Sequence, residues 1–260
     1  MPSVSVNEID LFYDEQNPNN LEDTVVFLHG AGGNHMSWWQ QVPTFREQYR
    51  CISVDQRGFG RSLDPSGAGV TRFTDDLEAL LDELEIDRVA LVAQSMGGRS
   101  ALGLAVRSPE RVRALVMADT WGFFDWPELQ VRAAELREAQ SDASAPLTDR
   151  ALGPYFQANN PAGTFLYRQI FDLNPPRAQQ SLAAGAPTKA EVEGLEVPSM
   201  FLVGSEDAIT PPEILRAVHE IVPGSKFVEV PSCGHSVYFE QPDTFNEIVG
   251  RFLADQFGAA

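Results

Sequence analysis

The sequence predicts an α/β fold, built on a mostly parallel, doubly wound sheet with an inserted small helical cap. Two features indicate the sheet: short runs rich in Val, Ile and Leu recur along the 260 residues, and helical stretches separate them. A third feature, a long segment of different composition after residue 120, indicates the insertion. We therefore expect residues 1–120 and 190–260 to form the core and residues 121–189 to form the cap.

The expected elements follow one another in the order that such a sheet requires. Residues 3–14 alternate polar and apolar side chains, as an antiparallel edge pair does, and a loop follows. The short apolar runs predict parallel strands at residues 24–29, 51–55, 89–93, 114–119, 200–203 and 226–230. Helical spacing or an alanine-rich composition predicts helices at residues 74–84, 96–108 and 243–257.

Aromatic, proline, alanine and glutamine residues replace the strand runs between residues 121 and 189, where a helix is expected at 128–140. Because this segment follows one sheet strand and precedes the next, we expect it to lie over the carboxyl ends of the strands. Open α/β sheets bind their ligands at that edge. The insertion is therefore the expected cover of a ligand site.

The composition limits the classes of partner and the compartment. The chain has 37 acidic and 19 basic residues, and its formal net charge of −18 repels nucleic-acid phosphates and anionic lipid surfaces. It has no run of about 18 apolar residues, and its first residues lack the pattern of a signal peptide. We expect no nucleic-acid partner, no membrane association, a cytoplasmic location, and two reduced, structural cysteines, Cys51 and Cys233.

The run Leu-Val-Ala-Gln-Ser-Met-Gly-Gly at residues 91–98 is typical of a nucleophile elbow. Its serine, Ser95, falls on the sharp turn between a predicted strand and a predicted helix, where a strained backbone exposes the hydroxyl. The strand and helix backbones approach closely there, which requires small residues two positions before and after the serine, here Ala93 and Gly97. The pattern alone also fits an ordinary turn serine, so its surroundings decide.

A serine is a poor nucleophile at neutral pH and needs a histidine to take its proton and a carboxylate to orient that histidine. Only His235 follows a predicted strand with a later helix behind it; the other histidines are His29, His35 and His219. Asp207 follows the preceding strand, with Glu206 as its adjacent rival. Either residue type is often only a turn, cap or surface group, yet the order Ser, Asp, His is the one that this topology produces.

Stabilising an oxyanion requires N–H groups aimed at it. One donor is expected from Met96, the residue after the serine, and the other from the glycine-rich loop after residue 29, most simply from Ala31. The alternative is that this loop is only a flexible turn. We assign His29 to bracing the loop and not to catalysis.

Taken together, these motifs resemble the serine-dependent α/β-hydrolase superfamily over nearly the whole core. The resemblance rests on His-Gly-Ala-Gly at 29–32, Asp-Gln-Arg-Gly-Phe-Gly-Arg-Ser at 55–62, the elbow, Gly-Ser-Glu-Asp at 204–207 and Gly-His at 234–235. It implies an α/β-hydrolase fold and a chiefly structural role for residues 55–62. No specific family pattern covers the cap.

The departures from the family narrow the branch that the chain resembles. Ala93 stands where glycine is usual, which is tolerated but tightens the elbow, and a serine nucleophile argues against the haloalkane dehalogenases and epoxide hydrolases. Carbon–carbon bond hydrolases typically have Gly-Pro-Gly in the oxyanion loop and Trp after the histidine, whereas this chain has Gly-Gly-Asn at 32–34 and Ser236. Small carboxylesterases, enol-lactonases and cofactor-free perhydrolases fit these positions better.

We therefore predict hydrolysis of a small-molecule carboxylic ester or lactone through an acyl-enzyme, with no metal and no organic cofactor. Aromatic residues at the cap entrance are expected to line the substrate pocket, or alternatively only to join the cap to the core: Trp121, Phe123, Phe124 and Trp126. His35 and Met36 could also reach the pocket. Three alternatives stay open: a carbon–carbon bond hydrolase, a non-catalytic ligand-binding protein on the same fold, and a scaffold for other proteins.

Overall fold

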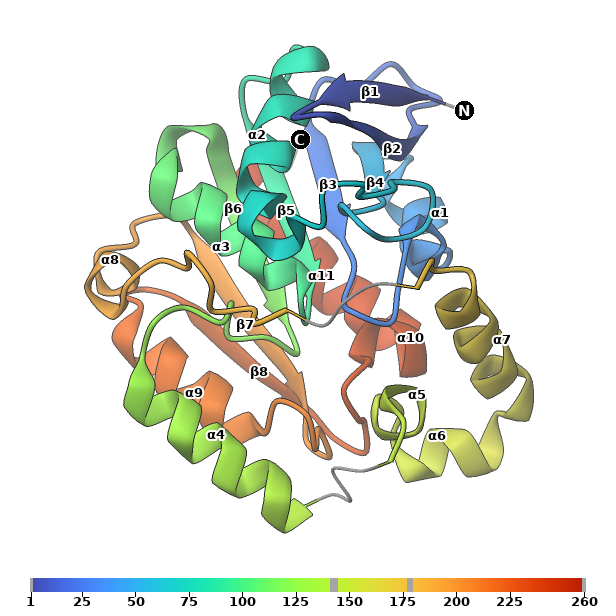
Figure 1. The fold of residues 1–260 in the computed structure, drawn as a ribbon, viewed down its shortest axis with the longest axis vertical. Helices are drawn as coiled ribbons and strands as arrows, with labels where there is room; N and C mark the ends of the chain where they lie inside the picture. The colour runs from blue at the N-terminus through green and yellow to red at the C-terminus, as the bar shows by residue number, and fades with distance from the viewer. Residues whose placement is uncertain (1, 141–144, 177–179, 259–260) are drawn as a thin grey trace.

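An eight-stranded sheet forms the centre of the molecule in this computed structural model, which describes residues 2–140, 145–176 and 180–258 (Figure 1). The spatial order of its strands is β1-β2-β4-β3-β5-β6-β7-β8. Their bounds are β1 Ser3–Val6, β2 Ile9–Gln16, β3 Thr24–Leu28, β4 Arg50–Val54, β5 Val89–Gln94, β6 Val112–Ala118, β7 Ser199–Gly204 and β8 Lys226–Val230. The predicted edge pair and the predicted parallel strands are all present, with ends that differ by one or two residues.

The pairing of the strands confirms the predicted sheet class. β1 pairs with β2, and β2 with β4, in antiparallel register, whereas every pair from β4 to β8 is parallel. The central strands β3 and β5 are buried along their whole length. Helices cover both faces there, which is why these strands read as continuous apolar runs and not as alternating ones.

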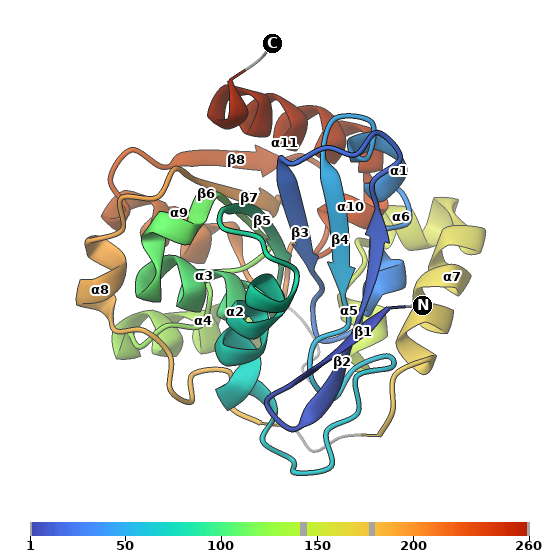
Figure 2. The ribbon, with the colours of Figure 1, turned by 90° about the horizontal axis from the view of Figure 1, so that it is seen from above.

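Helices pack on both faces of the sheet (Figure 2), and each face has its own apolar core. On one face lie α2, α3 and α9, and on the other lie α1, α10 and α11. Helices outside the inserted segment have these bounds: α1 Val42–Phe45, α2 Phe73–Glu83, α3 Gly97–Arg107, α8 Lys189–Glu193, α9 Pro212–Ile221, α10 Val237–Glu240 and α11 Pro242–Phe257. The three helices predicted in the core correspond to α2, α3 and α11.

In its described residues, the segment between β6 and β7 holds four helices before α8, on the side toward which the parallel strands point (Figure 1). They are α4 Pro127–Gln140, α5 Leu147–Arg150, α6 Pro154–Asn159 and α7 Pro161–Asp172. An ion pair between Arg132 of α4 and Glu213 of α9 joins this segment to the core. Two stretches of the predicted cap, 141–144 and 177–179, lie outside the described residues.

None of the helices in the described ranges is both long enough and apolar enough to cross a membrane.

Candidate active site

Ser95 stands between the end of β5 and the start of α3, with a backbone φ of 48°. Its N–H donates to the carbonyl oxygen of Ala118 at 3.0 Å, and its carbonyl oxygen accepts from the N–H of Gly98 at 2.9 Å. A Cβ placed on Gly97 would lie 2.2 Å from the carbonyl oxygen of Leu28, so only glycine allows the helix to start this close to β3. The local sequence thus fixes the serine in a left-handed turn at the edge of the sheet.

Three side chains from three loops form one hydrogen-bonded chain at this edge. The Nε2 of His235 lies 2.8 Å from the Oγ of Ser95, and its Nδ1 lies 2.8 Å from Oδ2 of Asp207. The other carboxylate oxygen of Asp207 accepts from the N–H groups of Ile209 and Thr210, both at 2.8 Å. The serine, histidine and aspartate are all buried. The carboxylate is therefore held on one side by the backbone and presents its second oxygen to the imidazole.

The rival carboxylate does not reach the histidine. Glu206 is exposed, and its N–H donates to the carbonyl oxygen of Cys233. The loop that carries His235 is held by the residue before the serine, because the side-chain amide of Gln94 donates to the carbonyl oxygen of His235 at 2.7 Å. The geometry thus selects Asp207 over its neighbour.

A second buried carboxylate, which sequence analysis did not single out, ties the two loops together. Asp119 follows β6 and accepts from the N–H of Gly204 at 3.1 Å and from the N–H of Val237 at 3.2 Å. Gly204 begins the loop of Asp207, and Val237 lies two residues after His235. Burial and the negative charge of Asp207 raise the pKa of Asp119 well above its ordinary value. The feature of the sequence that could have pointed to Asp119 is its position at the end of a predicted strand.

The two expected oxyanion donors flank the serine. Ala31 lines the cavity that contains Ser95, and Met96 directly precedes the first turn of α3. The first N–H groups of a helix have no intrahelical acceptor and point toward its N-terminus, which suits them to an anion. Both residues expected to supply these donors thus belong to the surroundings of the serine, one at its cavity and one at the start of α3.

His29 braces the glycine-rich loop. Its Nε2 accepts from the N–H of Gln56 at 3.1 Å, so its Nδ1 carries the proton and donates to the carbonyl oxygen of Gly30 at 2.8 Å. The side-chain amide of Gln56 donates back to the carbonyl oxygen of His29 at 2.7 Å. The ring is 1% exposed and does not line the cavity.

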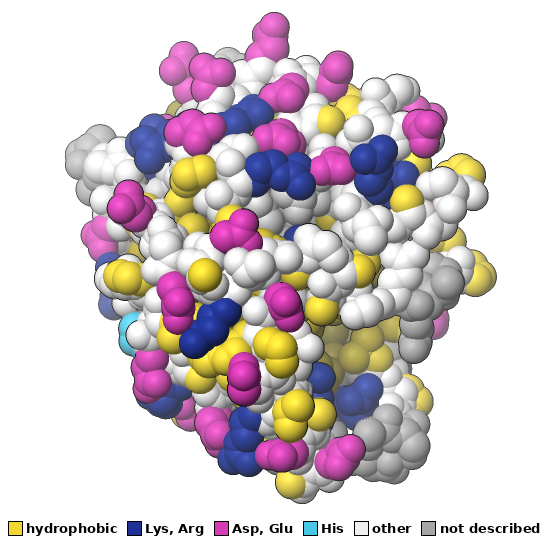
Figure 3. Space-filling model, turned by 60° about the vertical axis from the view of Figure 1, so that its left-hand side comes forward, with side chains coloured by type: hydrophobic (Ala, Val, Ile, Leu, Met, Phe, Trp, Pro, Cys, Tyr) yellow, Lys and Arg dark blue, Asp and Glu magenta, His cyan; other side chains and the backbone are white. Residues whose placement is uncertain are grey.

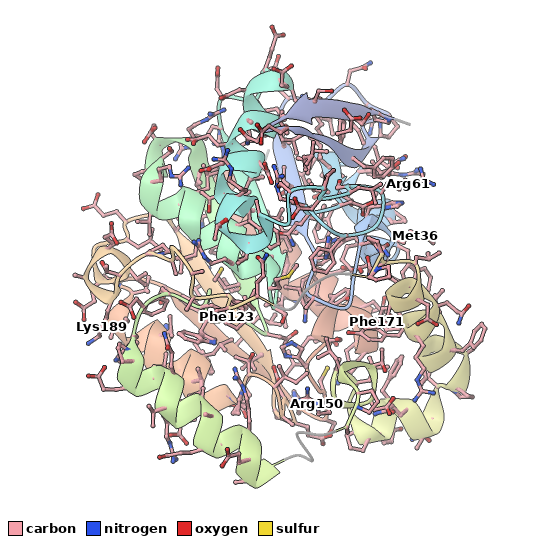
Figure 4. All side chains as sticks on the ribbon, in the orientation of Figure 1. Met36, Arg61, Phe123, Arg150, Phe171 and Lys189 are labelled. Atoms are coloured by element: carbon pink, nitrogen blue, oxygen red, sulfur yellow. The ribbon has the colours of Figure 1, made fainter. Side chains whose placement is uncertain are left out.

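A cavity of ≈ 230 Å³ lies against Ser95 and His235. Figure 3 shows a hollow on this side of the molecule, with apolar side chains in its depth and basic side chains at its edge. The inserted segment contributes several of its lining residues, among them Phe123, Arg137, Arg150 and Tyr167. Phe123 and Arg150 lie in the lower middle of the molecule, whereas Met36 lies at the side near α7 (Figure 4).

Residues 23–242 match the family model described as the alpha/beta hydrolase fold. The chain belongs to this family. BpoC of Mycobacterium tuberculosis, named as a non-heme bromoperoxidase, is 28% identical over 95% of this chain and 98% of its own. A 2-hydroxy-6-oxo-2,4-heptadienoate hydrolase of Pseudomonas putida is 29% identical over 90% of this chain and 92% of its own.

Two further proteins extend the range of relatives of this α/β-hydrolase. A 3-oxoadipate enol-lactonase of Acinetobacter baylyi is 27% identical, and the match covers 86% of each chain. The solved structure of a thermophilic esterase from Thermogutta terrifontis, with malate bound, superposes with a TM-score of 0.81 at 27% identity, over 97% of this chain and 96% of that one. The fold is thus shared with proteins named for several different reactions.

Of the four cap-entrance side chains that the sequence pointed to, Phe123 lines the cavity of this α/β-hydrolase and the other three do not. Trp121 and Phe124 are buried and pack against each other with ring centroids 5.7 Å apart, and neither lines the cavity. Trp126 does not line it either and lies under the ammonium of Lys189, 4.5 Å from its ring centroid. Phe123 is the aromatic residue of this stretch that faces the cavity. These rings join the inserted segment to the core, as in the alternative interpretation.

His35 does not line the cavity and instead forms hydrogen bonds with the 55–62 stretch. Its N–H and its Nδ1 lie 2.6 and 2.8 Å from Oδ1 of Asp55, and the second oxygen of Asp55 accepts from the N–H of Arg61 at 2.8 Å. Arg57 is buried and pairs with Asp76 through its Nε at 2.7 Å. The motif thus joins loops and helix α2 through buried charges.

The cavity residues Arg137, Arg150 and Tyr167 were missed by sequence analysis. Arg137 lies on α4, whose apolar residues show no single face, and Arg150 ends a helix of four residues, too short to show a period. Tyr167 is buried on α7, and its hydroxyl accepts from Ser236 at 3.2 Å. Only the amphipathic pattern of α7 could have pointed to this tyrosine.

In the part of the chain that the structure describes, the cysteines and possible metal ligands form no further site. Cys51 and Cys233 are buried free thiols, and burial raises the pKa of Cys51 to about 12. Within residues 2–140, 145–176 and 180–258, no group of three or more His, Cys, Asp or Glu side chains could hold a metal ion.

Proposed function

We propose that this α/β-hydrolase cleaves a small carboxylic ester or lactone through an acyl-enzyme on Ser95. The observation that carries the proposal is the chain of 2.8 Å contacts from Asp207 through His235 to Ser95, beside a cavity large enough for a small substrate. The esterase and enol-lactonase relatives support this reaction class. The helices of residues 121–189 act in this proposal as a cap over the cavity.

The reaction follows from the protonation pattern. The Nδ1–H of His235 donates a hydrogen bond to Asp207, which leaves Nε2 as the base that takes the proton of Ser95 as its oxygen attacks the ester carbonyl. The N–H groups of Ala31 and Met96 stabilise the oxyanion, and the imidazolium then donates its proton to the leaving alcohol. Water, deprotonated by the same imidazole, releases the acid.

The test is covalent labelling combined with a serine variant. We expect an organophosphonate to add one adduct mass to the peptide that contains Ser95, and Ser95→Ala to lower kcat for a p-nitrophenyl ester by on the order of 10⁴–10⁶-fold. Ser66→Ala removes an exposed loop serine and serves as the control. Full activity of Ser95→Ala, with the label on another residue, would refute the proposal.

Carbon–carbon bond hydrolysis is the second candidate, and the Pseudomonas putida relative favours it. That reaction uses the same three side chains but requires protonation of a substrate carbon before attack. A vinylogous diketone assayed beside the p-nitrophenyl esters separates the two. Turnover of the diketone with inert esters would replace the first proposal by the second.

A further inference from the structure

The cavity beside Ser95 has a charge opposite to that of the molecule as a whole. The chain has a net charge of −18, yet two arginines, Arg137 and Arg150, line this cavity. Among the described residues that line it, none is Asp or Glu. Among these described lining residues, a bound molecule therefore meets two guanidinium groups and no carboxylate.

Arg150 has its terminal nitrogens available. It is half-buried at the end of α5, and its Nε donates to the carbonyl oxygen of Ala145 at 3.1 Å. No carboxylate in the described part of the chain lies within ion-pair distance of it, whereas Arg168 of the same helical segment pairs with Asp149. Holding the Nε fixes the plane of the guanidinium, and its outer edge keeps the fork of N–H donors that fits a carboxylate.

Arg137 adds a second positive charge from α4. Its Nε donates to the carbonyl oxygen of Ile209, two residues after Asp207. Burial lowers its pKa, and the nearby positive charge of Arg150 lowers it further, while Asp207 opposes the shift. Both guanidinium groups line the same cavity, where their positive charges repel each other. An anion bound between them and the serine would offset that repulsion.

We propose that the substrate is a small ester or lactone that carries a free carboxylate, and that Arg150 binds this carboxylate while Ser95 attacks the ester carbonyl. The inference rests on the proposed function and names its substrate class. The cavity volume of ≈ 230 Å³ is below the ~300–1,000 Å³ of pockets for drug-sized ligands, so the carboxylate and the ester must be joined by a short chain. Arg137 contributes to the positive potential at this end of the cavity.

The test compares two esters that differ only in charge: p-nitrophenyl hydrogen glutarate and its methyl ester. We expect the wild type to prefer the acid, and Arg150→Gln to lower the ratio of the two kcat/KM values by about 10–100-fold, as the loss of a charge-assisted hydrogen bond predicts. Arg150→Lys should retain part of the preference. Arg251→Gln removes the same unit of charge from α11, outside the cavity, and should leave the ratio unchanged.

A binding measurement separates this inference from the proposed function. Monomethyl glutarate should bind to Ser95→Ala in calorimetry, and Ser95→Ala/Arg150→Gln should bind it at least about 10-fold more weakly. If the wild type hydrolyses neither ester, the proposed function fails, and the calorimetry alone decides the anion site. An unchanged ratio in both Arg150 variants, an equal loss in Arg251→Gln, or absence of binding to Ser95→Ala would overturn the inference.

Discussion

The serine at the elbow occupies a backbone conformation that costs about 1–3 kcal/mol for a residue with a Cβ. Ser95 keeps its φ of 48° because neighbouring groups hold both of its peptide bonds, through Ala118 on one side and Gly98 on the other. The strain places the hydroxyl in the turn, within 2.8 Å of the imidazole. A substitution that disturbs this turn should therefore lower activity as well as stability.

Gly97→Ala tests that dependence. The added Cβ would lie 2.2 Å from the carbonyl oxygen of Leu28, which is backbone and cannot rotate away, so the start of α3 must move. We expect a loss of about 1–3 kcal/mol in the free energy of unfolding and a fall in kcat of at least about 10-fold, measured by urea unfolding and ester hydrolysis.

Gly250→Ala is the matched control for this substitution. The same Cβ on α11 would meet only a ring carbon of Phe45 at 3.5 Å, an ordinary contact. Alanine favours a helix over glycine by about 1 kcal/mol, so this variant should be as stable as the wild type or more stable, with unchanged kcat. Equal changes in unfolding free energy and kcat in the two variants would show that the close approach of Leu28 is not the reason why position 97 requires glycine.

At the scale of elements, the sheet could be predicted because its central strands β3 and β5 are buried along their whole length and carry apolar runs. The carboxyl ends of parallel strands meet at one edge, so the order of Ser95, Asp207 and His235 in the chain indicated that they would lie together. The bonding partners of Asp119, and the contact of Glu240 with Gly153, could not be predicted, because they involve backbone N–H groups of loops distant in the sequence.

Which of the four predicted cap-entrance rings lines the cavity could not be predicted, and the reason lies in the backbone. Gly122 and Phe123 both have a positive φ, 77° and 56°, and this interrupts the alternation that would otherwise assign side chains to faces. Phe123 is thereby directed to the cavity, while Trp121 and Phe124 enter the core. A bulky residue with positive φ is rare, and nothing in the local sequence indicated one here.

Glu240, at the end of α10, joins the inserted segment to the histidine loop. Its carboxylate accepts from the N–H groups of Gly153, Gly234 and Ser236 at 3.0 to 3.3 Å. Burial raises its pKa above the ordinary value of 4.5, although these N–H groups oppose the shift. The folded protein therefore binds this proton more tightly than the unfolded chain does.

Glu240→Gln should make this linkage visible. Relative to a glutamine that does not titrate, the wild type loses stability as the pH rises from about 4.5 through the raised pKa of Glu240. The Tm of the wild type minus that of the variant should therefore decrease as the pH rises from about 4.5 to 7. Thermal unfolding across this range measures it, and a difference that grows with pH would mean that the N–H groups outweigh burial.

At the scale of the whole molecule, the negative electrostatic potential of the surface is opposite in sign to the charge of the two arginines in the cavity. Acidic side chains are spread over the face seen in Figure 3 and outnumber the basic ones in the chain by 37 to 19. A small anion approaching from solution is repelled over a long distance before it meets Arg137 and Arg150. Salt weakens the two effects unequally, because exposed and distant charges are screened more strongly than partly buried ones.

The salt dependence of kcat/KM for the anionic substrate follows from this difference in screening. Raising the ionic strength from ~0.01 to ~0.15 M shortens the Debye length from ~30 to ~8 Å, which removes most of the long-range repulsion and less of the short-range attraction to Arg150. The kcat/KM for p-nitrophenyl hydrogen glutarate should rise over this range, while that for the methyl ester stays constant. A fall for the acid would mean that the arginines already dominate the potential at the entrance. In that case Arg150→Gln should abolish the fall, whereas Arg251→Gln should preserve it.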